Sequence, residues 1–228
     1  MSAELGDWLA RLVATDTPLL PSPEAMQLWR SLGWSVVLAW LGASAVGRWW
    51  PGKASGWQRP WTAALVLALW AWAPGAYSAA YWLALVLQAP SGVTVLLCAG
   101  LLVERRGSTR PPAAAVDGAG LALASLAVLL GWALLLDTFA LLPVQLYARG
   151  FSPLVAGLVV AAALLPWVLA QRPLRATDWR MGVVPLAVLM LVVWRLPSGN
   201  AWDAVLDPCL WLVLHGVLLA RIRSYFYS

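Results

Sequence analysis

The chain has 228 residues, of which 62% are hydrophobic and 11% are charged, and its formal net charge is +5. A soluble domain is roughly 45–50% apolar and about 25% charged, so this composition excludes an ordinary soluble globular protein. The basic residues stand in short clusters between apolar blocks, where charge sets membrane orientation, so nucleic acid is excluded as a partner. We therefore expect one integral membrane domain, residues 1–228, with membrane lipids around it.

The start of the chain predicts a short amphipathic helix over residues 1–20. Leu5, Trp8 and Leu12 recur at helical spacing, and acidic side chains occupy the other face. Such a stripe is typical of a helix that lies in the membrane interface, although packing against a helical bundle accounts for it equally well. Acidic residues stand where a secretory signal needs positive charge, so we expect this segment to be retained.

The long apolar block from Trp61 to Val103 holds no charged residue. A helix of that length is about twice the roughly 30 Å thickness of the hydrocarbon core, so the block must cross the membrane twice. Pro74-Gly75 is the favoured turn, and Pro90-Ser91-Gly92 is the alternative.

The apolar blocks as a whole predict an all-α, polytopic transmembrane bundle with about seven spans. The first begins at Ser22-Pro23, which has the cap and first-turn proline of a helix start. The range 181–196 is short for a full crossing. The candidate spans are residues 24–48, 61–73, 76–103, 118–142, 153–170, 181–196 and 204–220.

The arginines and lysines predict the orientation of these spans. Cytoplasmic loops are enriched in basic residues, and eleven of the fifteen basic residues fall on one side of the predicted bundle. We therefore expect the N-terminus outside and the C-terminus in the cytoplasm. Short loops and a composition rich in Ala, Leu, Trp and Arg favour a multi-pass protein of a bacterial inner membrane. The eleven residues are Arg48, Lys53, Arg59, Arg105, Arg106, Arg110, Arg172, Arg175, Arg180, Arg221 and Arg223.

The chain is rich in tryptophan, with 17 residues. Several fall at the predicted interfaces, where amphipathic rings form belts. Others, such as Trp34, Trp132 and Trp211, lie deeper, where the indole N–H needs a partner.

Asp137 is the first candidate for a functional residue, because an acid inside a span costs at least about 2.5 kcal/mol on insertion scales. It lies in the outer part of the range 118–142 and should face the bundle. The alternatives are that it hydrogen-bonds a helix kink or meets Arg149 at the outer surface.

The strongest candidate pattern is Asp203, Asp207, Trp211 and His215, which recur every fourth residue and so share one face of a helix. His215 is the only histidine, about two turns from Asp207, and water could connect them in a proton path. The alternative is that the aspartates mark an exposed helix start and that His215 is a satisfied interior hydrogen-bonding group.

A third group of candidates lies in the predicted outer loops: Tyr147, Arg149, Arg195 and Asn200. The two arginines fall on the outer side, which carries few of the basic residues. With the nearby aspartates they could form a pocket for a phosphate or carboxylate headgroup. Ion pairing of Arg195 with Asp203 or Asp207 explains them as well.

The chain has too few ligands for a metal or haem site, with one histidine and two cysteines far apart in sequence, so we expect no metal and no cofactor. Few polar residues lie within the predicted spans. We therefore expect a non-catalytic subunit or scaffold of a membrane complex, with a membrane-protein partner. The alternatives are a transporter or lipid translocation protein that uses the intramembrane Asp and His residues, and an enzyme that acts on a lipid-linked substrate at the outer face.

Overall fold

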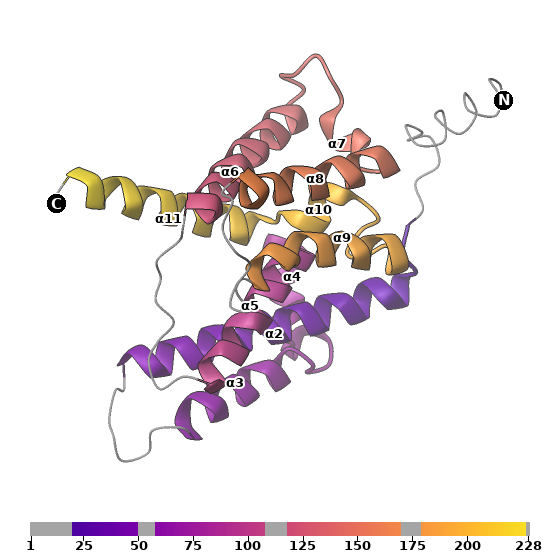
Figure 1. The fold of residues 1–228 in the computed structure, drawn as a ribbon. Helices are drawn as coiled ribbons and strands as arrows, with labels where there is room; N and C mark the ends of the chain where they lie inside the picture. Colours follow the sequence, from indigo (N-terminus) through magenta and orange to yellow (C-terminus); the bar gives the residue numbers. More distant parts are fainter. Residues whose placement is uncertain (1–19, 50–57, 108–117, 170–178, 227–228) are drawn as a thin grey trace.

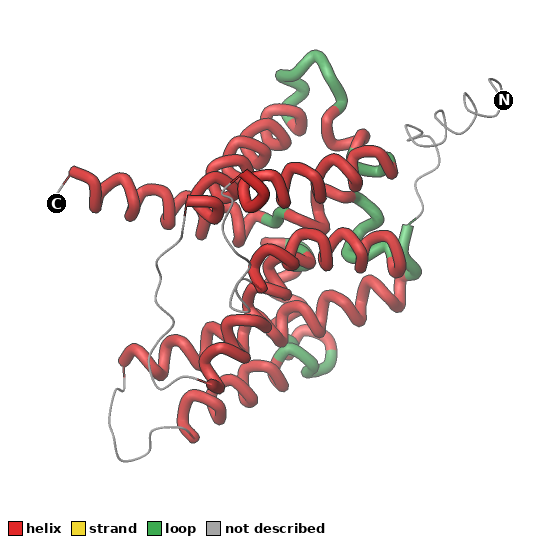
Figure 2. Tube along the Cα trace, in the orientation of Figure 1, coloured by secondary structure: helices red, strands yellow, loops and turns green. Residues whose placement is uncertain are grey.

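The structure is a computed structural model that describes residues 20–49, 58–107, 118–169 and 179–226 (Figure 1). Every regular element in these four ranges is a helix, and no strand occurs in them (Figure 2). The all-α class predicted from the sequence is therefore confirmed. The predicted amphipathic helix of residues 1–20 lies almost wholly outside the described residues.

The helix α2 (Pro23–Trp49) has 27 residues and organises one half of the molecule. The Ser22 hydroxyl accepts a hydrogen bond from the Ala25 N–H at 3.2 Å, so the predicted helix start at Ser22 is confirmed. The helix α3 (Gln58–Trp70) packs along α2, and two further helices, α4 and α5, contact it as well.

The chain reverses after α3 in a tight turn that contains a short 3-10 helix, η2 (Gly75–Tyr77). Across this turn the Ser78 hydroxyl donates to the Ala71 carbonyl at 2.7 Å. The bond satisfies a carbonyl that the end of α3 leaves without a helical partner. The reversal therefore falls at Pro74-Gly75, the turn that the sequence favours.

The helices α4 (Ala79–Leu87) and α5 (Gly92–Gly107) are separate elements, although residues 76–103 were predicted as one span. Ala80, in the first turn of α4, belongs to the same buried cluster as Trp34 of α2. The Trp34 indole also donates to the carbonyl of Gln88, which follows α4. Helix α4 thus packs against α2 near Trp34, and α5 contacts α2 as well. The break between α4 and α5 has a physical reason in Pro90, which cannot donate a helical hydrogen bond.

The helix α6 (Gly118–Thr138) ends before residue 142, the end predicted from the sequence. Ala140 has a positive φ of 54°, and the N–H groups of residues 140 and 141 bond back to carbonyls of the last turn. A left-handed residue of this kind closes a helix, and Pro143 follows it. The single-turn helix α7 (Leu146–Arg149) and the helix α8 (Pro153–Leu169) come next, and both contact α6.

The last part of the chain forms a 3-10 helix and three α-helices. The helix α9 packs against α5, α8 and α10. Arg195 follows α9 with a positive φ of 60°, and Leu206 between α10 and α11 is extended. The elements are η3 (Trp179–Gly182), α9 (Val183–Trp194), α10 (Ala201–Val205) and α11 (Pro208–Phe226).

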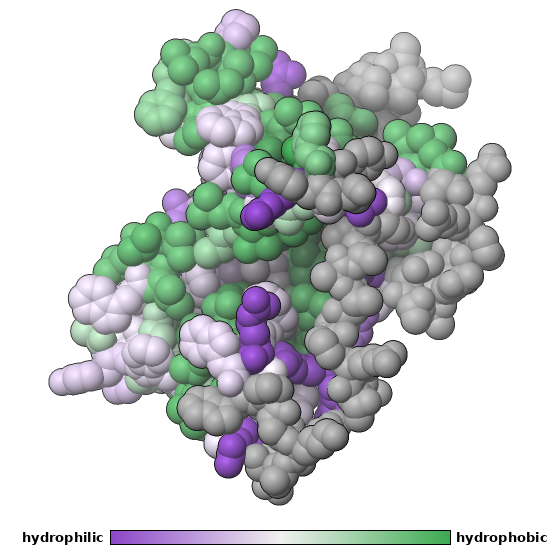
Figure 3. Space-filling view, turned by 90° about the vertical axis from the view of Figure 1, so that its left-hand side faces the viewer, coloured by the Kyte–Doolittle hydropathy of each residue, from purple (hydrophilic) through white to green (hydrophobic). Residues whose placement is uncertain are grey.

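The interior is built mainly from small side chains, whereas large apolar side chains face outward. Small residues let helices approach closely, which is typical of helix packing in membranes. Figure 3 shows apolar side chains spread over much of the described surface. Exposed examples from five helices are Leu65, Leu129, Leu158, Leu189 and Val213, and buried alanines include Ala43, Ala80, Ala119, Ala187, Ala201 and Ala204.

Within the described residues, one helix, Gly118–Thr138, is both long enough and apolar enough to cross a membrane. Pro153–Leu169 and Trp179–Trp194 are apolar but shorter. The seven spans predicted from the sequence are therefore not confirmed. The reason is that the apolar blocks are divided into helices of different lengths, most of them shorter than a full crossing requires.

Candidate functional site

Polar side chains surround the short helix α7 in a group that we call the α7 cluster: Asp137, Tyr147, Ser198, Asn200 and Asp203. The Tyr147 hydroxyl donates to Asp203 Oδ2 at 2.7 Å, and the Ser198 hydroxyl donates to the same oxygen at 2.5 Å. The Tyr147 backbone N–H donates to Asp137 Oδ2 at 2.7 Å. Tyr147 thus connects two carboxylates that come from different helices.

Asn200 holds α7 against α10 and is fully buried. Its Nδ2 donates to the Tyr147 carbonyl at 3.0 Å, and its Oδ1 accepts from the Trp202 N–H at 2.9 Å, which caps α10. The Ala201 N–H donates to the Gly150 carbonyl at 2.8 Å. A Cβ at Gly150 would collide with the Asn200 side chain, so this close approach requires glycine.

The Tyr147 phenol is a fixed donor. Burial, and then its hydrogen bond to the Asp203 carboxylate, raises the pKa of Tyr147 above its ordinary value. The hydroxyl therefore keeps its proton at neutral pH and stays in the hydrogen bond.

A second polar group, the Asp207 junction, lies where α5 and α11 begin: Ser91, Thr94, Asp207 and Leu210. Asp207 Oδ2 accepts from the Ser91 N–H at 2.8 Å and from the Thr94 hydroxyl, and Asp207 Oδ1 accepts from the Leu210 N–H at 2.9 Å. Asp207 is buried. One carboxylate therefore satisfies donors at the starts of two helices, where the helix dipoles favour negative charge.

The predicted stripe of Asp203, Asp207, Trp211 and His215 is wrong as a single helical face. Helix α10 ends at residue 205, Leu206 is extended, and α11 starts at residue 208. Asp203 therefore joins the α7 cluster, while Asp207 caps the next helix. Only Trp211 and His215 share a helix.

His215 lies at the contact between α6 and α11. The Trp132 indole donates to His215 Nε2 at 3.2 Å, and His215 Nδ1 lies 2.8 Å from the Trp211 carbonyl. Because an indole can only donate, these partners fit the neutral imidazole with its proton on Nδ1. The Trp211 indole in turn donates to the Val128 carbonyl at 3.1 Å, and a Cβ at Gly131 would overlap the Trp211 ring.

The two arginines of the predicted headgroup pocket stay apart from the acids. Arg149 is exposed and Arg195 is half-buried. Neither guanidinium makes an ion pair with a described residue; Asp203 accepts from hydroxyl groups, and Asp207 accepts from donors at two helix starts. The predicted pairing of Arg195 with these aspartates is therefore not found among the described residues.

The structure brings four of the candidates together in the α7 cluster: Asp137, Tyr147, Asn200 and Asp203. Asp207 and His215 each lie in a different group. The sequence reasoning placed Ser198 beside Arg195 and Asn200 but missed Ser91 and Thr94 as partners of Asp207. The signal for Ser91 and Thr94 was a helix start, with Ser91 before a glycine and after a proline.

No group of His, Cys, Asp and Glu residues suited to a metal ion occurs among the described residues. In the comparisons with known proteins, no family model, no curated protein and no solved structure matches this chain.

Proposed function

We propose that the chain is a multi-pass protein of a bacterial inner membrane that acts as a non-catalytic subunit or scaffold of a membrane complex. One observation carries this proposal: the carboxylates and the imidazole that could perform chemistry already bind partners within the fold. Asp203 and Asp207 each accept two or more hydrogen bonds, and both nitrogens of His215 are engaged. Groups that are held by partners within the fold stabilise it, and we propose that this is the role of these carboxylates and of the imidazole.

The exposed apolar surface supports the membrane part of the proposal. Monomeric soluble proteins rarely expose large contiguous apolar patches. Here Leu129, Trp132 and Leu136 on α6 are exposed, and only 17% of the apolar window of that helix is buried. Lipid or a partner helix would cover this surface at little cost, because both are apolar.

We propose seven crossings, carried by α2, α3, α5, α6, α8, α9 and α11. Helix α2 begins on the right of Figure 1 and α11 ends on the left, as an odd number of crossings requires. The arginines near the left-hand ends of α2, α5 and α11 favour the cytoplasm for that side. The N-terminal part would then be outside and the C-terminal part inside.

The short helices are compatible with crossing. Helix α3 has 13 residues and α9 has 12, so each rises only about 18–20 Å at 1.5 Å per residue. A bilayer thins locally around short spans, and flanking tryptophans and arginines reach the interface. Trp70 and Trp194, at the ends of these helices, are exposed and suit that position.

No observation on the described residues favours the transport or enzyme alternatives. Transport through Asp207 and His215 needs a path between them, and each is bound in a separate group. An outer-face enzyme needs Arg149 or Arg195 beside a free acid, and neither arginine pairs with one.

The proposal is tested by extracting the tagged full chain from its native membrane. Carbonate washing should leave it in the membrane fraction, and native mass spectrometry in a mild detergent should find a partner subunit in fixed stoichiometry. A harsh detergent should release the partner and serves as the control. Recovery of the chain by itself in mild detergent would contradict the subunit role, and recovery in the soluble fraction would contradict the membrane assignment.

A further inference from the structure

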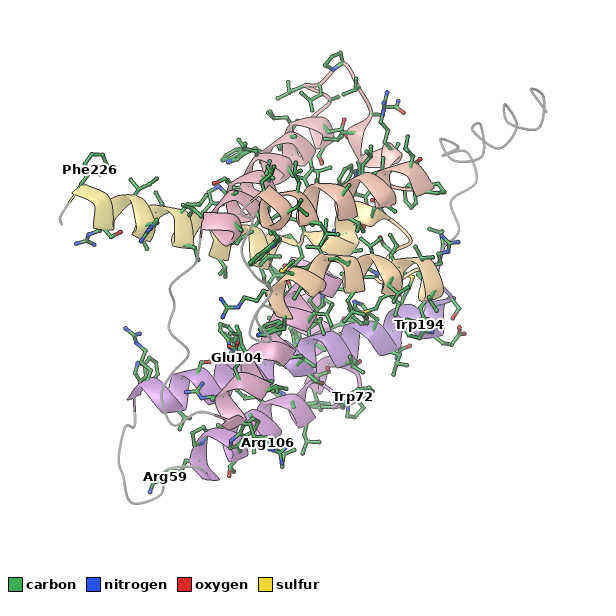
Figure 4. The ribbon with its side chains drawn as sticks, viewed as in Figure 1. Arg59, Trp72, Glu104, Arg106, Trp194 and Phe226 are labelled. Carbon is green, nitrogen blue, oxygen red and sulfur yellow. The ribbon has the colours of Figure 1, made fainter. Side chains whose placement is uncertain are left out.

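Five arginines of the described residues stand at the ends of helices, in a group that we call the arginine patch: Arg48, Arg59, Arg105, Arg106 and Arg180. These residues come from the end of α2, the start of α3, the end of α5 and from η3. The end of α5 lies beside the end of α2, where Arg105 contacts Ser44, and beside η3, whose Trp179 and Arg180 contact Glu104; α3 packs along α2. Figure 4 labels Arg59 and Arg106 in the lower part of the view, with Glu104 above them.

Two arginines of the patch are held in place from within the fold. Arg105 Nη1 donates to the Ser44 hydroxyl of α2 at 3.2 Å. Arg180 Nη2 lies 3.6 Å from Glu104 Oε2, and Glu104 Oε1 accepts from the Trp179 indole at 2.6 Å. Glu104 is the one acid among the described residues of these helix ends, so it offsets a single positive charge and leaves the patch strongly basic.

The other three arginines have no partner of this kind. Arg48, Arg59 and Arg106 are exposed, and none of them forms a hydrogen bond or ion pair with a described residue. Figure 3, which looks at the molecule from this side, shows hydrophilic side chains gathered next to apolar ones. An unpaired guanidinium offers a forked set of donors that matches the geometry of a phosphate.

Apolar side chains stand directly beside these free arginines. Val103 precedes Arg106 by three residues on α5, so the two share a helix face, and Val103 is 71% exposed. Trp49 follows Arg48 at the end of α2 and is 76% exposed. An apolar surface bordered by free positive charge has the two parts that an anionic lipid needs, one for the acyl chain and one for the headgroup phosphate.

We propose that the arginine patch binds headgroups of anionic phospholipids of the surrounding leaflet, with Arg48, Arg59 and Arg106 as the contacting residues. The inference rests on the proposed membrane function and adds the lipid class and the place where it binds. Arg105 and Arg180 are positioned by their own partners and contribute charge. Because the binding is electrostatic at the headgroup, it weakens as salt screens the charges.

The test uses the purified full chain in a neutral detergent and measures its thermal unfolding midpoint. Phosphatidylglycerol should raise the midpoint by several degrees, because a ligand that binds the folded state stabilises it. Phosphatidylcholine with the same acyl chains and soluble glycerol 3-phosphate should each give a much smaller shift. An equal shift with either control would contradict the proposal.

Matched variants locate the site. The triple variant Arg48→Gln, Arg59→Gln and Arg106→Gln should lose the preference for phosphatidylglycerol, whereas Arg30→Gln, far from the patch on α2, should keep it. A triple variant that keeps the wild-type shift would overturn the proposal. If the triple variant does not fold, the salt dependence of the wild-type protein tests the proposal. The rise in unfolding midpoint that phosphatidylglycerol causes should fall strongly between roughly 0.05 and 0.5 M salt, and a rise that does not change would contradict the proposal.

Two different results would contradict the proposed membrane function and the proposed lipid site. A chain recovered in the soluble fraction would remove the membrane assignment itself. A chain that stays in the membrane and shows no preference between the two lipids would remove the arginine patch as a lipid site and leave the membrane assignment standing.

Discussion

Asp203 and Asp207 stand four positions apart, yet the fold gives them different surroundings. Asp203 is half-buried and accepts from two side-chain hydroxyls, those of Tyr147 and Ser198. Asp207 is buried and accepts from the backbone N–H groups of Ser91 and Leu210 and from a hydroxyl. Hydroxyls rotate to find other partners, whereas buried backbone donors at a helix start have none. The two carboxylates should therefore differ strongly in their importance for stability.

The largest expected effect is that of Asp207→Ala. It leaves the two backbone donors of Ser91 and Leu210 buried without this acceptor, and we expect a loss of about 2–4 kcal/mol in the free energy of unfolding. Asp203→Ala should cost only about 1 kcal/mol, because its donors can turn to other acceptors. Unfolding by titration with a denaturing detergent measures both. Equal losses in the two variants would contradict the comparison.

Asp207→Asn sharpens the same comparison. Its amide keeps one acceptor oxygen but places an NH₂ group against a donor, so its loss should lie between those of the wild type and Asp207→Ala. A loss as small as that of Asp203→Ala would show that the charge and the second acceptor at the junction contribute little.

Asn200→Ala should have the next largest effect, a loss of about 1–2 kcal/mol, because it removes the α10 cap and one of the two hydrogen bonds that the Tyr147 carbonyl accepts. Gln27→Ala removes an exposed amide from α2 and is the matched control, with an expected change within about 0.5 kcal/mol. Similar losses in both variants would contradict the role of Asn200 in joining α7 to α10.

A smaller effect is expected for the contact between Trp132 and His215. A double-mutant cycle with Trp132→Phe and His215→Phe should give a coupling energy of about 0.5–1 kcal/mol, typical of one hydrogen bond and a ring contact. The cycle is measured by the same unfolding titration. A coupling energy near zero would show that the two side chains act independently.

The smallest effect is the response of Tyr147 to alkaline pH. The folded state raises the pKa of this phenol, so the stabilisation is fully present below the unfolded pKa near 10 and is lost as the pH rises through the higher folded value. Stability of the wild type should fall above about pH 10 relative to Tyr147→Phe, which has no proton to lose. Parallel pH profiles of the two proteins would contradict the hydrogen bond to Asp203.

Several helix starts and turns of this fold could be predicted from the sequence. The Ser22-Pro23 start and the Pro74-Gly75 turn were read correctly, because caps and turns are encoded by neighbouring residues. Asp207-Pro208 carries the same kind of helix-start signal, with proline in the first turn. The regular spacing of four residues favoured a single helix instead, and that interpretation was wrong.

The remaining features depend on contacts between distant parts of the chain. Asp207 caps α5 through Ser91, which lies 116 positions away. Tyr147 reaches Asp203 across 56 positions. No periodic pattern in one sequence encodes such pairs, so the α7 cluster could be predicted only as a set of polar residues and the Asp207 junction not at all.

The most direct test of the account is the location of the two ends of the described chain relative to the membrane. In a background with Cys98→Ala and Cys209→Ala, single cysteines are introduced as Ser22→Cys and Ser224→Cys and labelled with a maleimide that does not cross the inner membrane. Ser22→Cys should react in intact cells and Ser224→Cys only after the inner membrane is opened. Reaction of both positions from the same side would contradict an odd number of crossings.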